Sequence, residues 1–119
     1  MNRYNKKNRI IRKIARKRMK FLFELAAETI VENRYLANRY AYLAQRYAQK
    51  AKIRVPTRWK RLICHNCKSF LSPGVNCRYR LQSRKGKGSH ISMTCLECGE
   101  ITRYHIKAKK TKNKSNKNN

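Results

Sequence analysis

The chain has 119 residues, and its 32 lysines and arginines against five acids give a formal net charge of +27. This length supports one small domain or two very small ones. The five acids are all glutamates and none lies between Asn33 and Leu96, which nearly excludes an autonomous enzyme that needs paired carboxylates. Because a domain of this size buries a thin core, we expect a further cross-link to stabilise it. The charge favours a polyanionic partner.

The sequence predicts no membrane span, because it contains no run of 18 apolar residues. Its basic N-terminus continues into charged residues up to Arg18, where a signal peptide would carry its apolar segment. We therefore expect an intracellular, cytoplasmic protein. In that reducing compartment, five cysteines are better suited to metal binding than to disulfides.

Two amphipathic helices are predicted over residues 10–55, after a basic arm at residues 1–9 that we expect to be frayed. In each helix, apolar side chains share one face and polar or cationic side chains cover the opposite face. The principal apolar positions are Ile11, Ile14, Leu22 and Leu25 in the first helix and Leu36, Tyr40, Leu43 and Tyr47 in the second.

The break between the two helices rests on Asn33, a possible N-cap, because no glycine or proline separates them. A single long helix is the alternative. We favour a helical hairpin, since a hairpin buries both apolar stripes at once. Pro56 is expected to end the second helix, because a proline disfavours helical geometry at the preceding residue, Val55.

A ribbon of short strands is predicted over residues 56–106. This region holds all five cysteines and all four glycines, with alternating segments at 77–81, 91–95 and 101–106 that are typical of β-strands. The tail at residues 107–119 consists mainly of lysine and asparagine and is expected to be disordered. The predicted fold class is α+β, an N-terminal two-helix hairpin followed by a ribbon of short antiparallel strands.

Two C-x-x-C pairs, Cys64 with Cys67 and Cys95 with Cys98, are separated by 27 residues. Each pair can chelate a cation from a tight turn, and Gly99 supplies the backbone freedom that the second turn needs. Four thiolates complete a tetrahedral Zn²⁺ site. Because such a site leaves no open position for water or substrate, the predicted zinc ion is structural and not catalytic.

The fifth cysteine and the three histidines carry weaker signals. Strand alternation places Cys77 on one face with Tyr79 and Leu81, so Cys77 is interpreted as a small core residue rather than a reactive thiol. His65 lies inside the first cysteine pair and is an alternative ligand, but four thiolates already suffice. His90 and His105 have no acidic neighbour in the sequence, so we expect structural or surface roles for the histidines.

Basic residues on the predicted ribbon favour nucleic acid as the partner. One strand presents Arg78 and Arg80 on a single face, and a second group surrounds Trp59, which we expect to pack against the helices rather than stack on a base. Without a helix-turn-helix or Cys₂His₂ pattern, RNA is favoured over duplex DNA. The candidate RNA-binding residues are Arg58, Lys60, Arg61, Arg78, Arg80, Arg84, Lys85 and Lys87.

Two sequence motifs are more specific than the paired cysteines: Trp59-Lys-Arg61 before the first pair, and Pro73-Gly-Val-Asn-Cys-Arg-Tyr-Arg80. With the two basic helices and the C-x-x-C units, they resemble the archaeal ribonuclease P protein component 4 family over about residues 9–106. Tyr79 stands where that family commonly has valine, and the lysine and asparagine tail lies outside its pattern.

The resemblance implies an L-shaped protein, with the helices as one arm and the zinc ribbon as the other. It implies a subunit of the ribonuclease P holoenzyme that is not itself catalytic, because the RNA carries the Mg²⁺ and cleaves precursor tRNA to leave a mature 5′ end. The implied partners are protein component 1, further ribonuclease P protein subunits and the specificity domain of the RNA. The protein would neutralise phosphate repulsion, so that the RNA works at lower Mg²⁺.

Residue by residue, the resemblance implies that Cys64, Cys67, Cys95 and Cys98 are the zinc ligands. It implies RNA contacts by Arg78, Arg80 and the basic residues around Trp59. The apolar helix residues named above would divide between the core of the hairpin and the interface with component 1.

Three other functions remain as alternatives. A ribosomal or ribosome-assembly zinc-ribbon protein would share the charge, the zinc and the tail but would bind ribosomal RNA. A transcription-associated ribbon would contact a polymerase, although such ribbons seldom carry this charge density. An independent nuclease is the least favoured, because the chain has so few acids to bind Mg²⁺.

Overall fold

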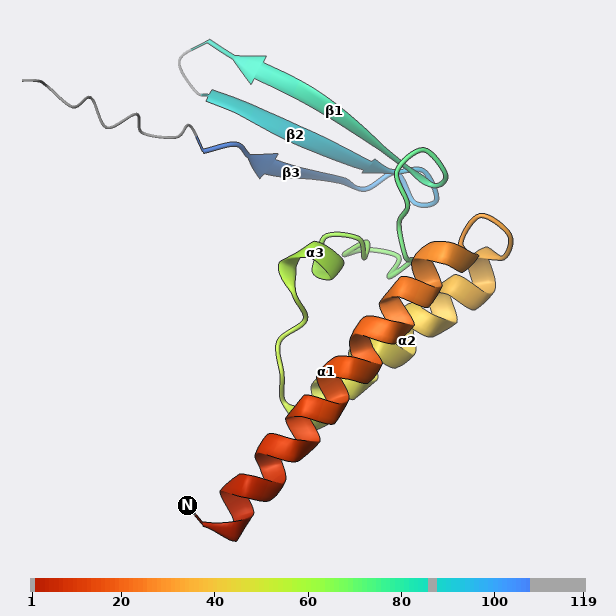
Figure 1. Cartoon of the computed structure of the whole chain (residues 1–119). Helices are drawn as coiled ribbons and strands as arrows, with labels where there is room; N and C mark the ends of the chain where they lie inside the picture. The colour runs from red at the N-terminus through yellow and green to blue at the C-terminus, as the bar shows by residue number, and fades with distance from the viewer. Residues whose placement is uncertain (1, 86–87, 108–119) are drawn as a thin grey trace, which may run out of the picture.

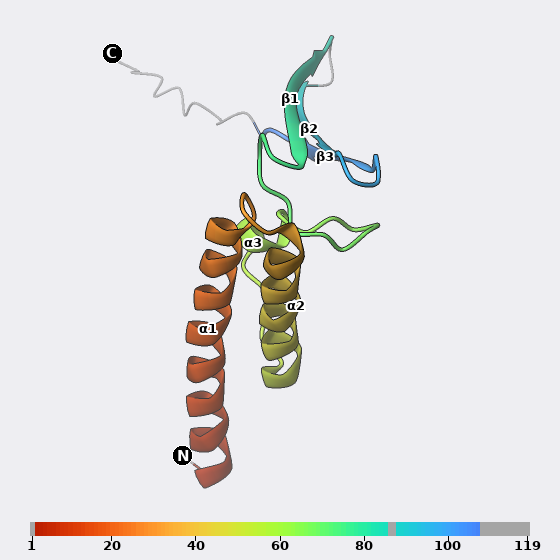
Figure 2. The same cartoon turned by 90° about the vertical axis from the view of Figure 1, so that its right-hand side faces the viewer.

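The computed structural model describes residues 2–85 and 88–107, apart from the side chain of Arg84, and has two arms (Figure 1). The predicted tail from residue 108 and Lys87 lie outside the described residues. The helical arm and the sheet point in different directions in two perpendicular views (Figures 1 and 2). The elements are α1 (Arg3–Thr29), α2 (Arg34–Ala51), α3 (Thr57–Lys60), β1 (Cys77–Arg84), β2 (Gly88–Cys95) and β3 (Ile101–His105).

The two long helices form the predicted hairpin, which confirms the break at Asn33. The extended backbone of Asn33 (φ −144°) starts α2, and its side-chain oxygen accepts a hydrogen bond from the Leu36 backbone N–H at 3.0 Å. That bond satisfies one of the amides that a helix start leaves without an intrahelical partner.

No helix in the described part of the chain combines the length and the apolar character that a membrane span requires.

Alanines form the buried stripe of α2. Ala37, Ala41, Ala44 and Ala48 follow helical spacing and are at most 3% exposed. Small side chains let the two helices approach closely, so that the larger residues of α1 fill the space between them. The buried residues that α1 contributes to this core are Met19, Phe23 and Ala26, followed by Ile30 at its C-cap.

The first helix begins at Arg3, seven residues before the predicted start at Ile10. The side chain of Asn2 caps it by accepting from the Tyr4 backbone N–H at 3.5 Å. The expected frayed arm is therefore helical from Arg3 onward, because arginine and lysine favour helix even where no apolar period marks it. With 27 residues in α1 against 18 in α2, the N-terminal turns of α1 extend beyond α2 (Figure 1).

The second helix ends at Ala51, so the expectation that Pro56 ends it is wrong. Lys52 adopts the left-handed conformation (φ 54°), and its N–H donates to the carbonyl oxygens of Ala48 and Gln49. This C-cap turns the chain four residues before the proline. Pro56 instead precedes α3, where its fixed φ suits a helix start.

Aromatic rings from α3 and from the segment that follows it cover one side of the hairpin. Trp59 stacks on Phe23 with ring centroids 5.3 Å apart and planes within 7°, and Phe70 lies 6.5 Å from Phe23 on centroids. The Phe70 N–H donates to the Asn38 side-chain oxygen at 2.8 Å. Trp59 is 6% exposed, so the expectation that it packs against the helices is confirmed.

The three strands form one antiparallel sheet in the order β1-β2-β3. A second small core lies at the end of the sheet where Cys77 pairs with Cys95, and it includes Leu71 and Met93. Cys77 is 1% exposed, as expected for a core residue. Leu81, on the same face as Cys77, is 72% exposed, because this core covers only one end of the strand.

Replacing Phe23 by alanine should lower the free energy of unfolding by about 3–5 kcal/mol, because the ring between Trp59 and Phe70 is lost. Phe21→Ala is the matched control, because Phe21 is 62% exposed and its loss should cost at most about 0.5 kcal/mol. Guanidinium denaturation of both variants measures the difference. Equal losses would contradict a core centred on Phe23.

Candidate metal centre and basic surfaces

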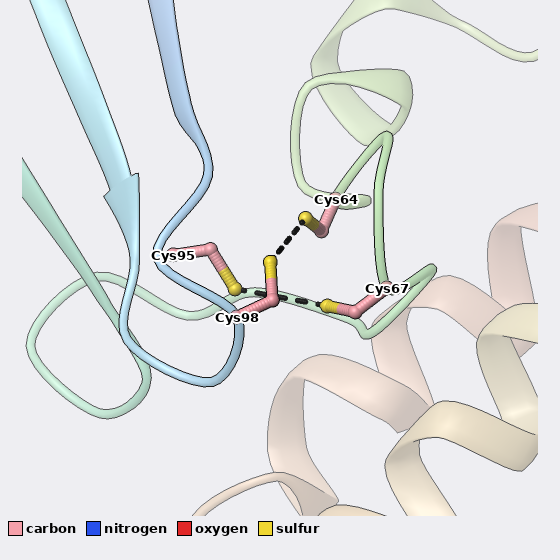
Figure 3. Close-up of side chains that lie close together, drawn as sticks. All are labelled: Cys64, Cys67, Cys95 and Cys98. Carbon is pink, nitrogen blue, oxygen red and sulfur yellow. Dashed lines mark hydrogen bonds between the residues drawn. The ribbon is translucent and has the colours of Figure 1, made fainter.

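Four cysteines from separate segments meet at the junction of the two arms (Figure 3). The Sγ atoms of Cys64 and Cys98 are 3.5 Å apart, and those of Cys67 and Cys95 are 3.7 Å apart. All four Sγ atoms lie within 4.8 Å of one another. The structure thus brings together the four cysteines that the sequence singled out.

The two cysteine turns share one backbone design. In the first, the N–H of Lys68 donates to the Cys64 carbonyl at 3.1 Å; in the second, the N–H of Gly99 donates to the Cys95 carbonyl at 2.9 Å. The donor is left-handed in both cases, with φ of 60° at Lys68 and 80° at Gly99. Glycine adopts that conformation freely, so the predicted need for freedom at Gly99 is confirmed.

Three thiols of the cluster, those of Cys64, Cys95 and Cys98, have shifted pKa values. Burial raises the pKa of Cys95 to about 12 and also raises the pKa of Cys64. A hydrogen bond from the Glu100 backbone lowers the pKa of Cys98 to about 6. Thiolates are the metal-binding form, so a cation must displace protons from the two buried thiols. Metal binding at this site therefore releases protons and strengthens as the pH rises.

The donor set fits a four-coordinate metal ion. A tetrahedral ion with metal–sulfur bonds of about 2.3 Å requires sulfurs about 3.8 Å apart. The two closest sulfur pairs, at 3.5 and 3.7 Å, are near that value. These four cysteines could therefore hold a metal ion with little rearrangement, and four protein ligands would leave no position for a substrate.

The histidines lie outside this cluster. His65 is exposed within the first cysteine turn, so nothing in the geometry requires it as a replacement ligand. His90 is 5% exposed and lies 3.0 Å from the side-chain oxygen of Gln82, which also accepts from the Ser92 hydroxyl at 3.0 Å. His105 is exposed, with its ring 6.4 Å from that of His90. The Gln82 interactions depend on strand register and had no signal in the sequence.

The sheet has a cationic face that the sequence located only in part. Strand alternation places Arg78 and Arg80 on one face of β1. The register pairs Arg80 with Ser92 and Ser92 with Arg103, so exposed Arg103 joins the same face from β3. Alternation along residues 101–106 could have shown which face of its own strand Arg103 occupies. Only the strand pairing shows that this is the face that carries Arg80.

The second predicted basic group lies elsewhere. The Arg58 guanidinium sits 4.7 Å from the Trp59 ring centroid, and Arg61 sits 4.5 Å from that of Tyr104. Tyr104 pairs with Ile91 and so belongs to the face opposite Arg80. The structure therefore does not merge the two predicted basic groups into one surface. Lys60 and Lys85 are exposed at separate places.

The predicted partner-binding residues divide into two groups. Ile11 and Ile14 are 44% and 49% exposed on α1. Six others are half-buried in the hairpin: Leu22, Leu25, Leu36, Tyr40, Leu43 and Tyr47. Sequence reasoning missed Ile10 and Phe21, which are 51% and 62% exposed and share the side of α1 that carries Ile14. Unpaired apolar surface of this kind is typical of a protein contact.

Asn76 connects the segment after the first cysteine turn to the second turn. Its side-chain oxygen accepts from the Ser72 N–H at 2.7 Å, and its amide nitrogen donates to the Phe70 carbonyl at 2.8 Å. Its own carbonyl accepts from the Leu96 N–H at 2.9 Å. The residue is 1% exposed, so these bonds satisfy a buried amide. This role accounts for the asparagine in the motif that precedes Arg78.

The architecture defines a small two-armed protein in which a helical hairpin joins a cationic antiparallel sheet at a four-cysteine cluster. The RNase P Rpr2/Rpp21/SNM1 subunit domain matches residues 18–99. Ribonuclease P protein component 4 of Thermococcus sibiricus is 45% identical over 113 residues, covering 94% of this chain and 92% of that protein. The same component of Pyrococcus furiosus is 44% identical over 115 residues, with 96% of each covered.

Two solved structures share the fold. A chain in the cryo-EM structure of archaeal ribonuclease P with mature tRNA has a TM-score of 0.70 and 45% identity, covering 80% of this chain and 78% of that one. The structure of Pfu Rpp21 has a TM-score of 0.58 and 42% identity, covering 77% of this chain and 99% of that one. The chain therefore belongs to the Rpr2/Rpp21/SNM1 family of ribonuclease P subunits.

If the four cysteines hold a metal ion, its removal should unfold the sheet while much of the helical hairpin persists, because the two arms have separate cores. Chelation followed by near- and far-UV circular dichroism measures the two effects. Cys95→Ala should abolish stoichiometric metal binding, whereas Cys77→Ala, the matched control outside the cluster, should retain it. An unchanged near-UV signal after complete metal removal would contradict a structural role.

Proposed function

We propose that this subunit binds the RNA of ribonuclease P and assists it in removing the 5′ leader of precursor tRNA. The observation that carries the proposal is the cationic face formed by Arg78, Arg80 and Arg103 within a fold that belongs to this subunit family. Guanidinium groups suit phosphate contacts, and folded RNA is recognised largely by shape. The mature tRNA bound in the related archaeal ribonuclease P structure supports a tRNA precursor as the substrate.

The protein's proposed contribution is electrostatic. Neutralising phosphates lets RNA segments approach one another, so the RNA folds and holds its substrate at lower Mg²⁺. The chain itself carries only five acids, and we assign the catalytic Mg²⁺ to the RNA. The other basic residues assigned to RNA are Arg58, Lys60, Arg61, Arg84, Lys85 and Lys87, of which Lys87 lies outside the described residues.

We further propose that the four cysteines hold one structural Zn²⁺. The all-sulfur donor set and its spacing favour zinc in a closed tetrahedral site. Structural zinc in small domains contributes on the order of 10 kcal/mol of folding free energy. Here it would fix the sheet against the helical arm and so position the cationic face.

Protein component 1 is the proposed partner of the helical arm. The exposed side chains of Ile10, Ile14 and Phe21 form an apolar stripe on α1, to which Ile11 adds a neighbouring position. A heterodimer through this stripe leaves the cationic face of the sheet free for the specificity domain of the RNA, and other protein subunits would complete the assembly. We propose the cytoplasm as the compartment, where reducing conditions keep the cysteines available for zinc.

Capture of the tagged protein from its host at salt high enough to strip nonspecific phosphate binding should recover ribonuclease P RNA as the dominant RNA. Sequencing of the retained RNA measures this. Dominant ribosomal RNA would instead support the alternative of a ribosomal or ribosome-assembly zinc-ribbon protein. An undifferentiated mixture would contradict selective binding by the captured protein.

The double variant Arg78→Gln/Arg80→Gln should raise the Mg²⁺ concentration that the reconstituted enzyme needs for half-maximal cleavage. It should also reduce the slope of log K against log salt by about 2, one unit for each lost phosphate contact. Lys13→Gln/Arg16→Gln, two exposed cations of α1 away from the apolar stripe, is the charge-matched control and should leave the Mg²⁺ requirement near that of the wild type. Identical effects of the two variants would contradict a specific role for the sheet.

A further inference from the structure

A cleft of about 680 Å³ lies between the last turns of α2 and the first cysteine turn. The segment that joins α2 to α3 runs back along the hairpin and contributes a third side (Figure 1). The volume falls in the range of about 300–1,000 Å³ that is typical of small-molecule sites. The cleft lies apart from the arginines of β1 and β3 on the cationic face of the sheet.

The walls of the cleft are held by backbone hydrogen bonds. The N–H of Ile53 donates to the Ala48 carbonyl at 3.0 Å, which fixes the turn after α2. The Cys64 N–H donates to the Ser69 carbonyl at 3.0 Å, and these two residues flank the cysteine turn on the other side. Because both walls are built into the fold, a ligand would meet a largely preformed site.

The floor of the cleft is aliphatic. Ile53 and Val55 are half-buried, and Ile63 is 8% exposed. Trp59 does not line the cleft, because its ring is committed to the stack on Phe23. A flat apolar group such as the face of a nucleobase can bury surface against these side chains.

The rim is cationic and has no acid. Arg54, Lys60 and Lys68 line the cleft and are exposed, whereas none of the five glutamates does. In the part of the chain that the structure describes, the ion pairs join Lys20 to Glu24 and Arg34 to Glu97, and so involve other cations. The three rim cations are therefore available to the phosphates of a bound polyanion.

Two glutamine side chains also line the cleft. Gln45 is half-buried on α2, and the oxygen of Gln49 accepts a hydrogen bond from Arg46 at 3.2 Å. A side-chain amide both donates and accepts, which matches the mixed donors and acceptors on the edge of a base. A lone phosphate could pair with the rim cations but would bury no apolar surface against the aliphatic floor.

We propose that this cleft receives one unpaired nucleotide of the ribonuclease P RNA, an inference that rests on the RNA-binding function proposed above. The base lies on the Ile53 and Val55 floor with its edge toward Gln45, and the flanking phosphates contact the rim cations. An apolar side chain of a partner protein would contact the floor but would gain nothing from the three exposed rim cations, whereas a nucleotide with its flanking phosphates would use both. The charge therefore favours RNA over a protein segment.

The test probes base reactivity in ribonuclease P RNA assembled with the full chain and protein component 1, using dimethyl sulfate and carbodiimide. Wild-type protein should protect the pairing edge of one unpaired nucleotide that Gln45→Glu leaves reactive, with affinity for the RNA falling about tenfold. Arg39→Gln is the matched control, because it lowers the net charge by the same one unit at an exposed position of α2 outside the cleft.

A second variant covers the case in which Gln45→Glu fails to fold. Lys68→Asn removes a rim cation, and asparagine tolerates the left-handed backbone at this position (φ 60°). This variant should leave the pairing edge of the same nucleotide reactive. Protection that persists in both cleft variants, or that Arg39→Gln removes equally, would overturn the proposal but leave RNA binding intact. Lost binding of component 1 with unchanged RNA protection would reassign the cleft to protein. Wild-type protein that protects no RNA would contradict the proposed function itself.

Discussion

The four-cysteine cluster is the constraint on which the arrangement of the two arms depends. Cys64 and Cys67 lie in the chain between Ile63 and Phe70, and both of those residues belong to the helical core. Cys95 ends β2 and belongs to the core of the sheet. The two cores share no residue, and the ion pair between the arms, Arg34 with Glu97 at 3.9 Å, is too exposed to hold them by itself. Cys64 itself packs into the core of the sheet, so a metal ion bound by all four sulfurs would fasten the turn between Ile63 and Phe70 to the end of β2.

This construction explains how a chain with so few acids can carry so much charge. The interior is built from aromatic rings, alanines and cysteines, so the cations are left on the surface with few internal partners. The arginines of β1 and β3 share one face of the sheet, while α1 exposes Ile10 and Ile14 on the other arm. Because these surfaces lie on different arms, the subunit can engage an RNA and a protein partner at the same time. Their relative placement is set at the cysteine junction.

Local chemistry made several features of the fold and site predictable from the sequence. Asn33 could be identified as a cap because a side-chain oxygen at a helix start satisfies a nearby amide. The paired C-x-x-C units identified the four-cysteine cluster, since each pair needs only one tight turn to bring two sulfurs together. Cys77 was assigned to the core from strand alternation and Trp59 was expected to pack against the helices, and both are buried. Each of these predictions depends on residues close together in the chain.

The sequence by itself thus determined the helical hairpin, the strand segments, the membership of the four-cysteine cluster and the cationic character of the protein. The tertiary structure alone decided which surfaces those residues form. Arg103 joins Arg80 only through the register across Ser92, and Asn76 becomes a structural link only when Leu96 lies beside it. The cleft beside Gln45 exists because α2 and the first cysteine turn meet in space. Periodicity shows which side chains share a face, but contacts between distant segments arise from packing, which no local pattern encodes.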